Sequence, residues 1–407
     1  MKPLVSLLFV LLWTFPSWAG PPPEGANLKQ LIDYALAHNP GWQASQSGLA
    51  QERVKVEEAG GWPEPMLRLE TWLAPQSQQW MYSQRLPLWG ETGFNQEAAR
   101  LEAEAAQYQH EANRRRLVRQ VKATYYDLWL LSETPKLLTE NQKTMERMAE
   151  LGSFESQRNT DMLEGIFQAQ AKIGENAFDL IKMQDQLLDA QVRLNSLLGI
   201  NQGPLIQNLA EPPMPEFKAD LTQLIEAARQ TNPELLALNR GTEAAQQRGD
   251  LENRMRYLPR FELSLTYERA GMEGTGKDAY ALGLGMNLPF FSSAQAGKAE
   301  RAQLETLKQG QISAQRQLNL DQEVTLAYNR AQNSRRLVSV FEDQLLPPLK
   351  RSYQLAERLY GVGKKNMMTA LKIKAQLVNM QIKDIQAKTE YLKALVELEE
   401  LTGQRFD

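Results

Sequence analysis

Residues 31–40 read LIDYALAHNP, and residues 224–233 repeat the pattern as LIEAARQTNP, 193 positions further along the chain. Further landmarks recur in the same order, at offsets of 202 to 204: Leu86-Pro87 with Leu288-Pro289, Tyr126 with Tyr328, and Leu197-Leu198-Gly199 with Leu401-Thr402-Gly403. A repeat of this length is unlike the 20–50-residue units of solenoids. The sequence therefore predicts one architecture built twice, with approximate internal symmetry.

The repeats divide the chain into segments. We expect a first repeat at 20–200, a linker at 201–219 and a second repeat at 220–407. The linker is rich in proline and has no helical period, so it is predicted to be extended and exposed.

Residues 1–19 have the parts of a secretory signal peptide. Lys2 supplies the positive charge, residues 4–13 are almost wholly apolar, and Ser17 and Ala19 are small residues at the −3 and −1 positions of a cleavage site. The alternative is a short membrane anchor, but a spanning helix needs roughly 20 apolar residues. We expect cleavage after Ala19 and export to the periplasm or beyond.

Composition argues against several functional classes. The chain has no cysteine, which excludes disulfides and thiolate chemistry. Its net charge is −3 and it lacks a basic domain, so no nucleic-acid partner is predicted, and Arg114-Arg115-Arg116 is expected on one solvated helix. His38 and His110 lack metal-ligand spacing, and His38 suits a helix end. Without a Ser-His-Asp set, nucleophile elbow or phosphate loop, the chain is predicted to be no enzyme and to need no metal or cofactor.

Most of the chain has the pattern of long helices. One seam with alternating gaps of 4 and 3 indicates coiled-coil-like packing: Leu320, Val324, Ala327, Ala331, Ser334, Val338, Phe341 and Leu345. Similar seams occur at 117–131 and 378–396. Helices over about 91–150 and 293–345 would each span roughly 80–90 Å at 1.5 Å per residue. Pro347-Pro348 should kink or restart the second one.

Each repeat also contains two segments of period two. Residues 261–268 and 279–288 alternate apolar with small or polar side chains, as do 67–73 and, less regularly, 80–86. They predict hairpins at about 65–88 and 260–289, with lengths that suit tilted membrane strands. Aromatic residues, which favour the membrane–water boundary, cluster at the strand ends: Trp62, Trp72, Trp80, Trp89, Tyr267, Tyr280 and Phe290. The alternative is two soluble hairpins packed on helices.

Four strands cannot close a membrane barrel, and lipid does not tolerate open strand edges. Two copies would supply 8 strands around a lumen filled by side chains, and three would supply 12 around a water-filled one. Three copies would also let the long helices form a second, helical barrel. The polar strand faces favour three. The predicted fold class is therefore mainly α, with a membrane β-barrel portion.

Taken in order, these features resemble the TolC family of outer-membrane efflux channels. The resemblance rests on the two Asn-Pro repeats, on the strand-to-helix junctions 84–90 (QRLPLWG) and 287–291 (NLPFF), and on Leu346-Pro347 with 360–363 (YGVG). It covers essentially the whole mature chain. The junctions and the short chain are similar to the heavy-metal cation efflux branch.

The resemblance implies a trimer with a 12-stranded barrel in the outer membrane and a helical barrel in the periplasm. Its partners would be a membrane-fusion adaptor and an inner-membrane pump, and the chain would be a passive duct for small solutes such as metal cations or drugs. The other class that fits the helices is a soluble periplasmic coiled-coil scaffold or adaptor.

The resemblance also implies a periplasmic end closed by polar contacts at the helical turns. The candidate residues there are Gly152, Arg158, Asp161, Gly361, Gly363 and Lys364. Asp161 or a neighbouring carboxylate in each of three copies would form a cation-selecting ring, and Arg158 or Lys364 would tie adjacent hairpins. The simpler interpretation is that these are ordinary solvated turn residues.

Overall fold

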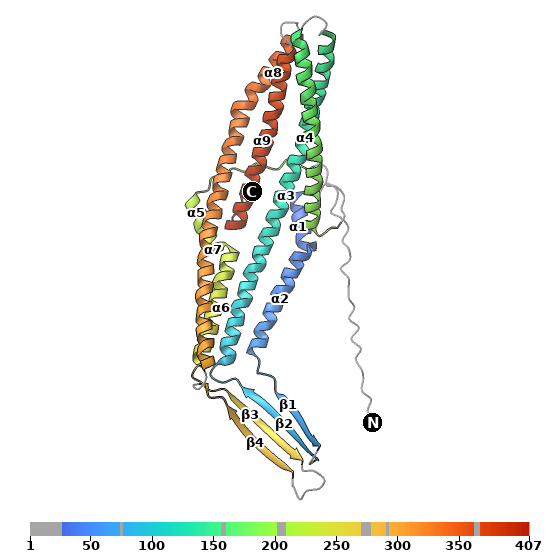
Figure 1. The fold of residues 1–407 in the computed structure, drawn as a ribbon. Helices are drawn as coiled ribbons and strands as arrows, with labels where there is room; N and C mark the ends of the chain where they lie inside the picture. Colours follow the sequence, from blue (N-terminus) through green and yellow to red (C-terminus); the bar gives the residue numbers. More distant parts are fainter. Residues whose placement is uncertain are drawn as a thin grey trace. The chain divides into compact units, whose positions relative to one another are not determined.

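The computed structural model describes residues 27–73, 76–155, 160–201, 209–269, 278–289, 293–361 and 367–406. Its elements are α1 (Leu28–His38), α2 (Pro40–Gly60), β1 (Met66–Leu73), β2 (Gln76–Leu86), α3 (Glu91–Glu155), α4 (Thr160–Leu198), α5 (Leu221–Thr231), α6 (Pro233–Met255), β3 (Phe261–Arg269), β4 (Ala279–Met286), α7 (Ser293–Ser339), the π-helix η3 (Val340–Leu345), α8 (Leu346–Gly361) and α9 (Met367–Thr402). The order of two helices, a hairpin and long helices occurs twice (Figure 1), which confirms the predicted repeat of helices and hairpins. None of the described helices is both long and apolar enough to cross a membrane.

The chain forms two compact units, and each draws on both repeats. One unit consists of Met1–Pro40, Gln120–Pro213 and Val340–Thr389. The other consists of Gly41–Arg119, Met214–Ser339 and Glu390–Asp407 and contains every described strand. Within that second unit the sheet lies at one end of α2, α3, α6 and α7 (Figure 1).

The two hairpins join into one antiparallel sheet with the order β1-β2-β3-β4. The pairing of β2 with β3 connects the repeats, and it leaves β1 and β4 as edges within the chain. The predicted start of the second strand at Trp80 was wrong, because β2 begins at Gln76. Residues 76–79 are polar, and their backbones pair with 70–73 without an apolar pattern to reveal them.

The repeated Asn-Pro motif ends one helix and begins the next. The Asn232 side chain accepts a hydrogen bond from the Leu235 N–H, which caps α6, and Pro233 needs no donor at the first helical position. The Asn232 amide also donates to the Leu401 carbonyl at 3.2 Å. Asn39 donates to Leu197 in the same way, at 2.9 Å. In each repeat the asparagine of the Asn-Pro motif thus binds the C-terminal end of the last helix, α4 or α9. This contact explains why the Asn-Pro motif and the Leu-x-Gly motif at that helix end recur together.

The heptad seam is confirmed through α7 and then changes register. Leu320, Val324, Ala327, Ala331 and Val338 are all fully buried. Beyond them, Leu345 is 37% exposed and Leu346 takes the buried place at 7%. The reason is η3, where the wider turns of a π-helix shift the following residues around the helix axis. Pro347 and Pro348, which lack backbone donors, follow in the first turn of α8, so the predicted restart at this point is confirmed.

The described part of the linker is less exposed than the sequence predicted. Residues 209–219 have no regular structure, as expected, but Pro212 is buried. Phe217 packs between the rings of Tyr328 and Phe406, and the Tyr391 hydroxyl donates to the Pro215 carbonyl at 2.6 Å. A proline-rich composition predicted extension correctly, but it gave no sign that the apolar residues of the linker would cover helices.

Candidate functional site: the two-faced sheet and the helical ends

One face of the sheet is apolar across all four strands. The register places Leu67, Tyr82, Leu265 and Leu282 in one row, and Leu69, Trp80, Tyr267 and Tyr280 in the next. These side chains are far from buried, and Leu282 and Tyr280 are each 77% exposed. A contiguous apolar surface of this kind marks a protein or membrane contact.

The opposite face is mostly polar or small, with Met66 and Met81 as its two large apolar side chains. Its rows are Arg68, Met81, Thr266 and Ala281, then Met66, Ser83, Ser264 and Gly283, then Arg85, Glu262 and Gly285. Since successive side chains of a strand point to opposite faces, the sheet separates an apolar side from a polar side. That is the arrangement of a wall between lipid and water.

Gln84 interrupts the apolar face near the helix end of the sheet, and Thr71, Gln78 and Arg269 form a polar row on the same face at the loop end. The Gln84 amide donates to the Pro63 carbonyl at 2.8 Å and to the Arg85 carbonyl at 3.0 Å. Backbone acceptors therefore satisfy this side chain. The irregular alternation that the sequence showed at Gln84 and Arg85 does not exchange the two faces of the sheet.

Of the predicted interface aromatics, three belong to the loop end of the apolar face. Trp80, Tyr267 and Tyr280 pair across adjacent strands, and the two tyrosine rings lie 5.0 Å apart. Trp72 lies in β1, where only its backbone is described, and Phe290 lies outside the described residues. Whether these residues contact a membrane stays a prediction.

The remaining two aromatics, Trp62 and Trp89, lie at the helix end of the sheet. Trp62 is 69% exposed, and Trp89 has a positive φ of 62°, which is uncommon for a bulky residue. The Trp89 indole donates to the Pro259 carbonyl at 2.8 Å. This bond links the passage from β2 into α3 with the passage from α6 into β3.

The aromatic residues at the loop end and those at the helix end lie at opposite ends of the strands, so the distance between the two levels is measured along a strand. Tyr267 lies six positions along β3 from Phe261, which is at the helix end of the strand. At about 3.3 Å per residue this is roughly 20 Å along the strand. Apolar bands of membrane barrels are about 25 Å tall and have aromatic girdles at both edges. The spacing therefore fits a sheet that spans the apolar part of a membrane.

The predicted turn residues lie at helix ends. Gly152 is in the last turn of α3, Asp161 is the second residue of α4, and Gly361 is the last residue of α8. Arg158, Gly363 and Lys364 lie outside the described residues, and the side chain of Asp161 is likewise not described. Their predicted role in closing a channel stays a prediction.

The structure shows contacts near these turns that sequence reasoning missed. Met145 of α3 and Leu371 of α9 form a small buried cluster. Lys374 of α9 pairs with Glu140 of α3 at 2.6 Å, and its ammonium lies 5.1 Å from the centre of the Tyr353 ring. These contacts tie the α3–α4 hairpin to the α8–α9 hairpin. The partners in the Met145–Leu371 and Glu140–Lys374 contacts are more than 200 positions apart, and no local pattern pointed to them.

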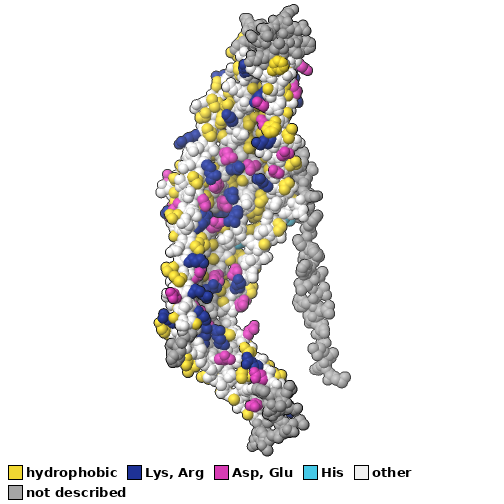
Figure 2. All heavy atoms as spheres, in the orientation of Figure 1, with side chains coloured by type: hydrophobic (Ala, Val, Ile, Leu, Met, Phe, Trp, Pro, Cys, Tyr) yellow, Lys and Arg dark blue, Asp and Glu magenta, His cyan; other side chains and the backbone are white. Residues whose placement is uncertain are grey.

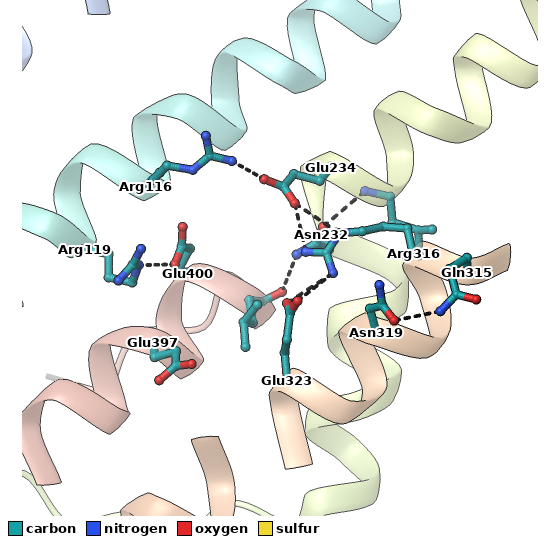
Figure 3. Close-up of polar contacts among 12 residues, drawn as sticks. Arg116, Arg119, Asn232, Glu234, Gln315, Arg316, Asn319, Glu323, Glu397 and Glu400 are labelled. Atoms are coloured by element: carbon teal, nitrogen blue, oxygen red, sulfur yellow. Dashed lines mark hydrogen bonds and ion pairs between the residues drawn. The ribbon is translucent and has the colours of Figure 1, made fainter. Parts of the chain in front are cut away.

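An ion-pair network joins the two repeats within the unit that contains the sheet (Figure 3). Arg316 of α7 pairs with Glu234 of α6 at 2.8 Å and with Glu323 at 3.1 Å. Glu234 also pairs with Arg116 of α3, from the first repeat. Each arginine can hold two carboxylates at once because the guanidinium is planar and has several donors.

Arg114, Arg115 and Arg116 lie on one helix, α3, as expected, and only Arg115 departs from the expected solvated position, since Arg114 and Arg116 are both exposed. Arg114 is exposed, and its one ion pair among the described residues is with Glu111, one turn away. Arg115 is largely buried, and Arg116 belongs to the network. The acidic partner of Arg116 is 118 positions distant, so the run of charges looked unpartnered in the sequence.

Glu400 of α9 forms a further ion pair with α3, close to the pairs of Arg116. It pairs with Arg119 of α3, and burial raises the pKa of its carboxyl, although Arg119 and Arg116 oppose that shift. A carboxyl with a raised pKa in the folded state contributes stability that is present below its unfolded pKa and is lost as the pH rises through the folded value. Acidification from pH 7 towards the ordinary range of glutamate should therefore stabilise the fold through this group.

Glu400→Gln is expected to reduce this pH dependence. The apparent Tm of the detergent-solubilised protein, followed by circular dichroism, should rise less between pH 7 and pH 5 in the variant than in the wild type. Coincident pH profiles for the two proteins would contradict the assignment.

The two histidines have aromatic and hydrogen-bonding neighbours. His38 stacks on Tyr34, and its Nδ1 lies 3.0 Å from the Tyr34 carbonyl. His110 stacks on Trp42 and lies 2.9 Å from the Ser45 hydroxyl, and burial lowers its pKa. Among the described residues, no three His, Asp or Glu side chains are grouped so that they could hold a metal ion.

Comparison with known proteins gives this architecture a family. Residues 224–404 match the model of the outer membrane efflux protein family. No curated protein matches the chain in sequence. The match covers the second repeat, and over these residues it confirms the resemblance noted in the sequence.

Solved structures extend the match over the first repeat. A membrane protein from Pseudomonas aeruginosa is 18% identical with a TM-score of 0.78, covering 93% of this chain and 94% of its own. The outer membrane protein VceC from Vibrio cholerae is 18% identical with a TM-score of 0.74, covering 93% and 97%. The open state of the MtrE outer membrane channel of Neisseria gonorrhoeae is 16% identical with a TM-score of 0.77, covering 94% and 90%. At these identities the likeness establishes the fold. Assignment to the heavy-metal branch stays a prediction.

Proposed function

We propose that this protein is the outer-membrane channel of a tripartite efflux system, a passive duct through which small solutes leave the cell. The observation that carries the proposal is the exposed apolar face of the sheet, backed by a polar face and bounded by two open edge strands. Lipid would cover the apolar face, and the polar face would line the water-filled path.

The open edges point to an assembly of several copies. Unpaired strand edges are costly in lipid, so β1 and β4 need partners. With every neighbouring pair antiparallel and the order β1-β2-β3-β4, β4 of one copy runs opposite to β1 of the next. The ring can therefore close without a parallel pair. We propose three copies, which make a 12-stranded barrel wide enough for a lumen filled with water.

The helices would then form the periplasmic part of the duct. Their free ends, beyond the Glu140–Lys374 pair, would meet a membrane-fusion adaptor and an inner-membrane pump that supplies the energy. Metal cations and drugs are both candidate cargoes. The soluble scaffold that the helices also suggested does not explain why a sheet should leave rows of leucine and tyrosine exposed.

The first test is extraction of the outer membrane followed by the mass of the purified particle. We expect a particle that requires detergent and has the mass of three mature chains, beginning after Ala19. A water-soluble monomer or dimer would overturn the proposal.

The turn residues have a test of their own. If Arg158 and Asp161 contribute to closing the periplasmic end, then exchanging their charges (Arg158→Asp with Asp161→Arg) should change the conductance of the closed channel in planar bilayers severalfold. The reason is that like charges converging on a narrow axis set both ion selectivity and the stability of closure. Unchanged conductance and selectivity would show that they are ordinary turn residues.

A further inference from the structure

The helix end of the sheet carries an exposed apolar residue beside every strand. Trp62 precedes β1, Leu88 and Trp89 follow β2, Tyr257 precedes β3 and Leu288 follows β4, and all of them are exposed. We call this set of five residues the helix-end belt. Tryptophan and tyrosine in such a position favour the head-group level of a membrane.

Two arginines accompany the belt without acidic partners among the described residues. The Arg254 guanidinium stacks on Phe94 at 4.8 Å, and its Nη1 donates to the Trp89 carbonyl at 3.3 Å. The Arg256 guanidinium lies over the exposed Tyr257 ring at 5.2 Å. Both side chains are exposed, and aromatic neighbours orient them while their charges stay unneutralised.

The charge differs between the two ends of the sheet. The chain segments at the helix end, 62–65, 85–91 and 254–260, contain four arginines and two glutamates. At the loop end, the described residues 70–73, 76–79, 268–269 and 278–279 contain one basic and three acidic residues. Figure 2 shows Lys and Arg side chains gathered on one face over the ends of α6 and α7 beside the sheet. A positive surface beside an apolar band attracts anionic head groups in the adjoining leaflet.

We propose that the helix-end belt, together with Arg254 and Arg256, binds the anionic head groups of phospholipids in the leaflet nearest the helices. The aromatic and leucine side chains reach the boundary of the acyl chains, and the guanidinium groups meet the phosphates, which they can bind with two parallel hydrogen bonds. The inference rests on the proposed membrane function, because it takes the apolar rows of the sheet as the membrane-spanning band.

The test counts lipids bound to the purified trimer by native mass spectrometry during titration with phosphatidylglycerol or, separately, phosphatidylcholine. We expect the wild type to retain phosphatidylglycerol preferentially, and the preference to weaken as salt increases. Arg254→Gln with Arg256→Gln should lower the apparent affinity for phosphatidylglycerol by about fivefold per arginine. Arg254→Lys with Arg256→Lys should keep most of it, because the charge remains.

Arg269→Gln is the matched control, since Arg269 is an exposed arginine at the loop end of the same sheet. It should leave phosphatidylglycerol binding unchanged. Inorganic phosphate at millimolar concentration should not displace the lipid, since free phosphate lacks the acyl chains that the belt contacts. Displacement by phosphate would overturn the lipid assignment in favour of a simple anion site.

The two proposals fail in different ways. A trimer that conducts and binds both lipids equally would overturn this inference alone, as would equal binding by the wild type and the double glutamine variant. A particle that is stable as a trimer or monomer without detergent would overturn the proposed function and the inference with it.

Discussion

Leu265→Lys is expected to remove most of the channel from the outer membrane. Leu265 lies near the middle of the apolar rows of the sheet, between Tyr82 and Leu282 on the adjacent strands. A lysine on the lipid face near the bilayer midplane costs about 2–4 kcal/mol, and each copy in the assembly would bear it. The measurement is the amount of trimer in the outer-membrane fraction, separated without heating, relative to the total protein made.

Thr266→Lys supplies the matched comparison. Thr266 is the next residue of β3, so its side chain projects from the polar face, in the row of Arg68, Met81 and Ala281. We expect normal amounts of trimer, with a shift in ion selectivity towards anions because a positive charge would line the water-filled path. If both lysines reduced the trimer equally, the two faces would not differ in environment, and the membrane assignment of the sheet would be wrong.

The fold could be predicted where its determinants are local. The period-two strands of the second repeat and the heptad from Leu320 to Val338 are patterns of neighbouring residues, and both appear where the sequence placed them. The helix end expected at His38, just before Asn39-Pro40, is local for the same reason, because proline acts on its own turn. The exposed apolar sheet face followed from the same alternation, so the main functional surface was visible in the sequence.

Other features depend on long-range partners and could not be predicted. The pairing of β2 with β3 joins segments from different repeats, and nothing in either segment specifies the other. The link from Arg116 to Glu234 spans 118 positions, and a run of arginines looks the same whether it is solvated or paired. The register change at η3 depends on one extra residue per turn, which a heptad count cannot detect. The turn residues rest on family resemblance rather than on any pattern of their own.

Gly199→Ala is expected to destabilise the protein by about 2–4 kcal/mol, the second large effect. Gly199 ends α4 with a φ of +76°, and the Ile200 N–H bonds back to the Asn195 carbonyl, as in a Schellman helix end. A side chain in this left-handed conformation costs about 1–2 kcal/mol by itself. In addition, a Cβ would lie 2.5 Å from the His38 carbonyl oxygen, and this backbone atom cannot move aside without disturbing the end of α1.

Two other glycines separate the two contributions to this loss. Gly403, the counterpart in the second repeat, has a φ of +69°, but the nearest atoms to its Cβ would be those of the Arg115 guanidinium, from 2.9 Å, at the end of a flexible side chain. Gly403→Ala should therefore cost little more than the backbone strain, about 1–2 kcal/mol.

Gly174, inside α4, has open space around it, and Gly174→Ala should stabilise by up to about 1 kcal/mol. Chemical denaturation of the detergent-solubilised variants measures all three. If Gly199→Ala were as mild as Gly403→Ala, then α1 could move away from the end of α4. The Asn39–Leu197 hydrogen bond would then not hold the two landmarks of the first repeat together.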